Sequence, residues 1–129
     1  MTTRRPTRRA RTKMTTDARH RYRTDHHAAL RGLLADCPDV REGQMFGYPA
    51  FFVGRRMFAC VHGAGIGLKV PAPLAVVLLR RTDTVPFQPH GRKPMREWIQ
   101  INRAVSADYA DDQDVLAAAR SFVTAECGV

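Results

Sequence analysis

Residues 48–70, YPAFFVGRRMFACVHGAGIGLKV, contain three short apolar runs separated by glycine-bearing segments. Within each run the side chains alternate in a pattern typical of half-buried strands. The three runs are residues 48–53, 57–62 and 66–70. Gly54 and the segment Gly63–Gly65 supply the tight turns that hairpins require. The stretch therefore predicts an antiparallel meander of three or four strands, with residues 40–47 as the fourth.

Apolar stripes at helical spacing predict three helices around this meander. Two helices are expected at residues 24–37 and 71–81, and a third begins near Asp111–Asp112. Their stripes are Leu30, Leu33, Leu34 and Cys37; then Leu74, Val77, Leu78 and Arg81; then Val115, Ala119, Phe122 and Val123. Short strands are expected at residues 85–87 and 96–102.

Boundary residues support these assignments. Thr24 is a candidate N-cap of the first helix, and Asp111 or Asp112 of the last. Pro86 has no N–H to donate to a sheet, so its segment is expected either at a sheet edge or not to be a strand at all. The strands form a block instead of alternating singly with helices, which predicts an α+β fold. We expect an antiparallel meander sheet covered by the N-terminal, middle and C-terminal helices.

The positive charge is concentrated at the N-terminus. The net charge is +9, and residues 1–23 hold nine Lys/Arg and one acid, which leaves twelve Lys/Arg and eleven acids for residues 24–129. The densest basic positions are Arg4, Arg5, Arg8, Arg9, Arg11 and Lys13. We predict a disordered arm at 1–23 that could contact nucleic acid without sequence preference, and a folded domain at 24–129. The alternatives are a solubilising tail, or a native start at Met14.

Several classes of protein do not fit the sequence. No apolar run approaches the roughly 18 residues of a membrane span, and no apolar segment follows the basic start. We therefore expect a cytoplasmic protein with no membrane partner. The three cysteines, Cys37, Cys60 and Cys127, are widely spaced and form no C-x-x-C, so neither a disulfide framework nor a zinc site is predicted. No metal and no cofactor are expected.

Catalytic motifs are also missing, and no catalytic residue is proposed. The sequence has no G-x-S-x-G, no H-E-x-x-H and no phosphate-binding glycine loop. Cys60 and His62 share one face of a predicted strand, where they could form a nucleophile pair, but ordinary strand residues are the better interpretation. His26 and His27 are adjacent on a helix, about 100° apart, so they do not chelate one ion.

A cationic loop is the candidate anion-binding site. Arginine can bind phosphate or carboxylate through two parallel hydrogen bonds, and lysine adds a point charge. The candidate residues are His90, Arg92, Lys93 and Arg96, with Lys69 from the preceding strand. The alternative is a solvated loop whose cations pair with Glu97 or Asp83.

Exposed aromatic side chains would indicate a different binding mode. Proteins that bind single strands by stacking expose two or three rings on one sheet face. Joint exposure of Phe51, Phe58 and Trp98 would favour this mode, and burial of all three would exclude it.

A family resemblance rests on several short segments taken in order. They are Gln44–Gly47, Gly54, Met57–Ala59, Leu68–Val70, Pro86–Phe87 and Gly91–Met95. From about Asp25 to Ala125 the chain resembles the N-terminal domain of the TfoX/Sxy proteins. The related YjbR/MmcQ group is the nearest alternative, which Gly67–Pro71 would also fit.

The resemblance implies an α+β fold with a curved antiparallel sheet and helices packed on it. It also implies association with the regulation of competence in full-length members, which carry a second, helical domain beyond the point where this chain ends. It supplies no catalytic residues.

Three functions follow as hypotheses. The first is a non-enzymatic regulatory or binding domain that acts through protein or polyanion contacts, and it predicts a sizeable exposed apolar patch. The second is nonspecific nucleic-acid binding by the arm, with the domain as a dimerisation unit. The third is a small-anion-binding protein or enzyme that uses the Arg92/Lys93 loop. A homodimer is expected because pairing would cover the edge strands of a short sheet.

Overall fold

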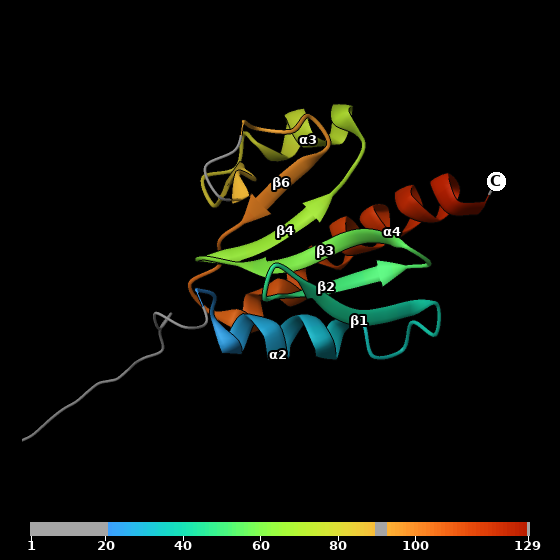
Figure 1. Cartoon of the computed structure of the whole chain (residues 1–129). Coiled ribbons are helices and arrows are strands. Elements are labelled where there is room, and N and C mark those ends of the chain that lie inside the picture. The colour runs from blue at the N-terminus through green and yellow to red at the C-terminus, as the bar shows by residue number, and fades with distance from the viewer. Residues whose placement is uncertain (1–20, 90–92, 129) are drawn as a thin grey trace, which may run out of the picture.

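The computed structural model describes residues 21–89 and 93–128, which form one six-stranded antiparallel sheet with helices (Figure 1). The strands are β1 (Val40–Met45), β2 (Tyr48–Val53), β3 (Arg56–His62), β4 (Gly65–Lys69), β5 (Thr84–Pro86) and β6 (Trp98–Ile101). The helices are α2 (Thr24–Leu33), α3 (Ala72–Leu78), the 3₁₀ helix η3 (Ser106–Asp112) and α4 (Gln113–Gly128). The predicted α+β fold is confirmed.

The sheet has the strand order β1-β2-β3-β4-β6-β5. Strands β1 to β4 form the predicted meander, with Phe51 opposite Ala59 and Ala59 opposite Leu68. β6 then pairs with β4, and β5 pairs with β6 at the far edge. The prediction that the Pro86 strand lies at an edge is therefore confirmed.

The first face of the sheet carries the main core. Alternate residues of the central strands point to this face and pack against α2 and α4, which lie on the same side of the sheet in Figure 1. The completely buried side chains of this core include Leu30, Ala59, Val61, Ile66, Leu68, Ile99, Ala119 and Val123. Burial of this apolar surface is the main source of folding free energy.

The second face holds a smaller cluster built from Ala50, Cys60 and Phe87. Phe87 comes from the segment that follows β5, and its ring lies over Gly67 of β4. A Cβ atom at Gly67 would lie 2.9 Å from Phe87 Cε1. Glycine at this position therefore allows the ring to lie directly on the strand.

The described chain begins with three residues of the predicted arm. Arg21 O accepts a hydrogen bond from Gly63 N at 2.9 Å, and Tyr22 forms an isolated bridge with Gly63. Arg23 pairs with Asp25 at 2.6 Å. The folded unit thus includes residues 21–23, and the basic positions from Arg4 to Lys13 lie outside the described residues.

Helix ends differ from the predictions, and α3 ends at Leu78, three residues before the predicted end at Arg81. α2 ends at Leu33, four residues before the predicted end, and turns lead on to Cys37. The cap position of α2 is Arg23, which makes no side-chain cap hydrogen bond, so the assignment of Thr24 was wrong. α4 begins at Gln113, directly after the predicted cap candidates Asp111 and Asp112, and the buried carboxylate of Asp112 accepts two hydrogen bonds from Arg103.

Candidate binding surface

An open apolar groove of about 480 Å³ lies between α3 and residues 94–98. We call it the α3 groove and define it by Val76, Leu79, Pro86, Met95 and Trp98. Val76 is 58% exposed, Leu79 38% and Met95 37%. Large apolar side chains that gather on one open surface indicate a site for another molecule.

The sequence of α3 explains why the groove is apolar. The helix APLAVVL contains no polar residue. A helix that is apolar on every side is normally buried on every side. Here Ala75 and Leu78 face the core, while Val76 and Val77 face solvent. The prediction that Val77 belongs to the core stripe was wrong, since Val77 is 53% exposed.

The groove adjoins two further hollows that share Met95 and Trp98. One, of about 470 Å³, is also lined by Lys69, Arg96 and Glu97. The other, of about 180 Å³, lies over the second face of the sheet and is also lined by Met45, Phe46, Met57, Phe87 and Pro89. The three methionines of this surface add flexible side chains that adapt to different apolar partners.

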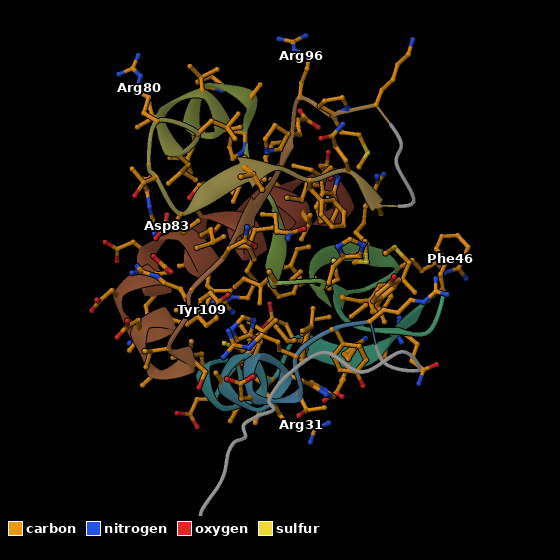
Figure 2. All side chains as sticks on the ribbon, turned by 90° about the vertical axis from the view of Figure 1, so that its left-hand side faces the viewer. Arg31, Phe46, Arg80, Asp83, Arg96 and Tyr109 are labelled. Carbon is orange, nitrogen blue, oxygen red and sulfur yellow. The ribbon has the colours of Figure 1, made fainter. Side chains whose placement is uncertain are left out.

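Phe46 projects from the turn between β1 and β2 at the edge of this surface (Figure 2). Its side chain is 74% exposed, and its φ is 51°, while Gly47 has a φ of 85°. Two consecutive positive φ values are typical of a two-residue hairpin turn, in which Asn, Asp or Gly is usual at the first position. A phenylalanine there combines backbone strain with apolar exposure, and such combinations often occur at functional surfaces.

Exposed cationic side chains belong to the segments that form the groove. Arg80, Lys93 and Arg96 are exposed, and Figure 2 shows Arg80 and Arg96 projecting from the same end of the molecule. Among the described residues, no ion pair involves any of the three. Glu97 is the only acid within α3 and residues 79–80 and 93–98, so these segments carry three cations against one acid.

The predicted anion site is described only in part. Lys69 and Arg96 line the same hollow, but Lys69 Nζ lies 3.2 Å from Glu126 Oε1, so its charge is already paired. Lys93 and Arg96 are exposed. His90 and Arg92 lie outside the described residues. Anion binding by this loop stays a prediction.

Cys60 and His62 do not form an activated pair. Cys60 is completely buried, and burial raises the pKa of its thiol to about 12. His62 Nδ1 instead lies 3.2 Å from Gln100 Oε1, and its ring packs between Tyr48 and Phe87 at centroid distances of 4.7 and 5.4 Å. Because the thiolate is the reactive form, a raised pKa makes Cys60 a poor nucleophile.

A buried polar cluster behind β6 was not predicted from the sequence. His26 Nε2 donates to Arg103 O at 2.8 Å, and the Tyr109 hydroxyl donates to Ile101 O at 2.8 Å. Burial lowers the pKa of His26 and raises that of Tyr109 to about 12. Asp112, also buried, pairs with Arg103 at 2.9 Å. The cluster fixes the chain after β6, and its hydrogen bonds are all internal.

Other kinds of site find no support in the described residues. Within residues 21–89 and 93–128, no three His, Cys, Asp or Glu side chains converge as metal ligands would. In the same part of the chain, no helix has the length and apolar character needed to cross a membrane. Phe51 and Phe58 are buried while Trp98 is partly exposed, so the three rings do not form a stacking surface.

A known protein family is similar to most of this chain. The model of the TfoX N-terminal domain matches residues 32–122. This range runs from the end of α2 into α4 and includes the whole α3 groove. No curated protein and no solved structure matches the chain.

Proposed function

This chain belongs to the TfoX N-terminal domain family, and from that premise we propose that it is a non-enzymatic binding domain that recognises a partner protein through the α3 groove. One observation carries the proposal. α3 lacks any polar residue, yet it presents Val76 and Val77 to solvent next to the exposed Met95.

The composition of the groove supports a protein partner. The centres of protein interfaces are rich in aromatic residues, methionine and arginine and poor in acidic residues. Trp98 and Met95 are shared by all three hollows of the surface, Arg96 lines the groove, and Arg80 is the exposed neighbour of the lining residue Leu79. A partner side chain that enters such a pocket loses contact with water, and these are the positions at which binding energy concentrates.

The same composition supports a role without catalysis. The groove is lined mainly by apolar side chains, and the one charged side chain among its lining residues, Arg96, can orient a ligand but does not form a nucleophile and base pair. The two other hypotheses, arm-driven nucleic-acid binding and the Arg92/Lys93 loop, stay predictions, because the basic arm positions from Arg4 to Lys13 and Arg92 lie outside the described residues.

Two matched variants test the proposal. Val76 in the groove and Val105 before η3 are 58% and 57% exposed, so Val76→Asp and Val105→Asp introduce the same charge at equally exposed sites. Both variants are expected to remain folded, because exposed substitutions usually change stability by less than about 0.5 kcal/mol. Thermal unfolding of each variant checks this point.

The wild type and both variants are then used as bait in the lysate of the source cells, and the captured proteins are quantified by mass spectrometry. We expect a protein that the wild type and Val105→Asp retain and that Val76→Asp loses by about tenfold or more. Equal capture by all three baits would show that the groove is not the binding surface.

A further inference from the structure

We infer that the ligand of the α3 groove is an amphipathic helix of a partner protein whose polar flanks are acidic. This inference rests on the proposed function, since it specifies what the groove binds. It follows from the main-chain groups of β5 and from the charge around the groove, which restrict the ligand of this apolar surface in two different ways.

The first restriction concerns a partner that would bind as an added strand. Such a strand needs outward-facing N–H donors on β5, the edge strand beside the groove. Asn102 N donates to Asp83 O at 2.7 Å, so the main-chain groups of Asp83 point towards β6. In an antiparallel pair the residues whose main-chain groups point towards the partner strand recur at every second position. The main-chain groups of Val85 therefore also face β6.

The two remaining residues of β5 offer no donor either. Thr84 N already donates to Arg81 O at 3.3 Å, and Pro86 has no N–H. An extended peptide beside the groove would leave its own main-chain acceptors without partners from β5, at a cost for each one that becomes buried. A helix satisfies its main-chain hydrogen bonds internally, so it can enter the groove without help from the edge.

The second restriction concerns charge. Arg80 follows the lining residue Leu79 just beyond the end of α3, Arg96 lines the groove, and Lys93 directly precedes the lining residue Pro94. A helix that places Leu or Phe side chains on Val76, Leu79 and Trp98 directs its flanking residues towards these cations. Glutamate or aspartate on the flanks would therefore be attracted, and lysine or arginine repelled.

Two ligands that this protein itself could supply, its N-terminal arm and a second copy of the domain, suit the groove less well. The N-terminal arm carries six cations between Arg4 and Lys13 and would be repelled by the rim. A second copy could offer the acidic segment 106–114, but the one aromatic side chain of that segment, Tyr109, is fully buried in its own domain. That segment has the charge but not the apolar stripe that the groove requires.

The test uses the ¹⁵N-labelled full chain and three synthetic peptides of about 15 residues, a length that spans roughly 22 Å as a helix. The first has leucines at helical spacing and glutamates on its flanks. The second replaces every glutamate with lysine. The third keeps the composition of the first but alternates its leucines as in a strand. Titrations are followed by amide chemical shifts at low and physiological salt.

The acidic helical peptide is expected to shift the resonances of Val76, Leu79, Met95 and Trp98 and to bind at least tenfold more tightly than the other two. Its affinity should fall with added salt. Arg96→Glu should weaken binding several-fold. Arg55→Glu, at an exposed turn residue outside the groove, is the control with the same charge change and should leave the affinity unchanged.

The other outcomes separate this inference from the proposed function. Equal binding of the acidic and basic helices would overturn the charge preference and leave a protein-binding groove. Tighter binding of the alternating peptide would overturn the helical ligand. Groove resonances that move with protein concentration alone would identify a second copy as the ligand. If none of the peptides shifts these resonances at millimolar concentration, the proposed function fails with the inference.

Discussion

Replacing Gly67 with alanine would place a methyl group under the ring that covers the second face of the sheet. The added Cβ would lie 2.9 Å from Phe87 Cε1 and 3.1 Å from Cys60 Sγ. Real Cβ atoms essentially never come within 3.0 Å of such neighbours. Both Phe87 and Cys60 are buried, so neither can turn towards solvent. The ring must move away from the strand, together with the segment that leads to the α3 groove.

The size of the effect follows from two opposing contributions. Forcing an extra methyl group into a packed site costs about 1–3 kcal/mol. Alanine restricts the unfolded chain more than glycine does, which returns about 0.4–1 kcal/mol. We expect Gly67→Ala to lower the free energy of unfolding by about 1–2 kcal/mol. For a domain of about 100 residues this corresponds to a fall in Tm of roughly 5–12 °C.

This change is measured by thermal and urea unfolding of the full chain, and the signal that reports unfolding is the fluorescence of Trp98. It is the only tryptophan, and its ring centroid lies 5.2 Å from that of Phe87, so its emission should also shift in the folded variant. Gly32→Ala is the control, because its added Cβ has nothing within 4 Å and it lies in α2. That control should gain about 0.5–1 kcal/mol. A Gly67→Ala variant as stable as wild type would refute the account of how Phe87 is seated.

Further predictions concern a buried ion pair, a pH dependence and the arm. Asp112→Ala should lower the free energy of unfolding in urea by about 2–3 kcal/mol, because it removes the buried partner of Arg103, a side chain that itself keeps some contact with water. A loss below about 0.5 kcal/mol, the size of an ordinary surface substitution, would contradict this. Hydrogen bonds from Arg31 hold the pKa of Glu42 at about 2, below the ordinary value of 4.5, so the stabilisation is present above about pH 4.5 and is lost as the pH falls towards 2. Glu42→Gln should therefore flatten the loss of stability over that range, and an unchanged acid limb would contradict the assignment. A chain starting at Met14 should lose most of the DNA binding and its salt dependence in fluorescence anisotropy, whereas equal binding by both chains would place the DNA site on the folded domain.

The strand pattern was predictable because side chains on the two faces of a strand follow a strict period of two. Phe51 and Val53 lie on one face and Ala50 and Phe52 on the other, as the alternation indicated. The missing N–H of Pro86 left two possibilities, an edge strand or no strand, and the structure has the edge strand. Such local rules need no knowledge of which segments meet in space.

The environment of α3 could not be predicted in this way. An entirely apolar helix has no polar face to mark its exposed side, so the choice between Val77 and Ala75 as the buried residue depends on how the helix meets the sheet. Asp112 is similar. Its spacing suited a helix cap, but a guanidinium group nine residues earlier, on Arg103, determines its actual role.

The candidate site was predicted only in part for the same reason. The cationic loop was visible as a cluster within a few residues, and Lys93 and Arg96 do stand at the surface. The apolar groove beside them is assembled from β5, α3 and residues 94–98. No single window of the sequence contains it, and the resemblance to known proteins gave no ligand that would have pointed to it.

The missing donors of β5 also limit how copies of this domain can associate. Sheets that join edge to edge can grow into an unlimited stack only if both edges accept a neighbour. With β5 unable to donate, β1 is the edge at which another strand can add. Two copies joined there in antiparallel fashion would be related by a twofold axis, and each would have used its one receptive edge. The predicted homodimer, if it forms through β1, is therefore a closed assembly that cannot seed a fibre.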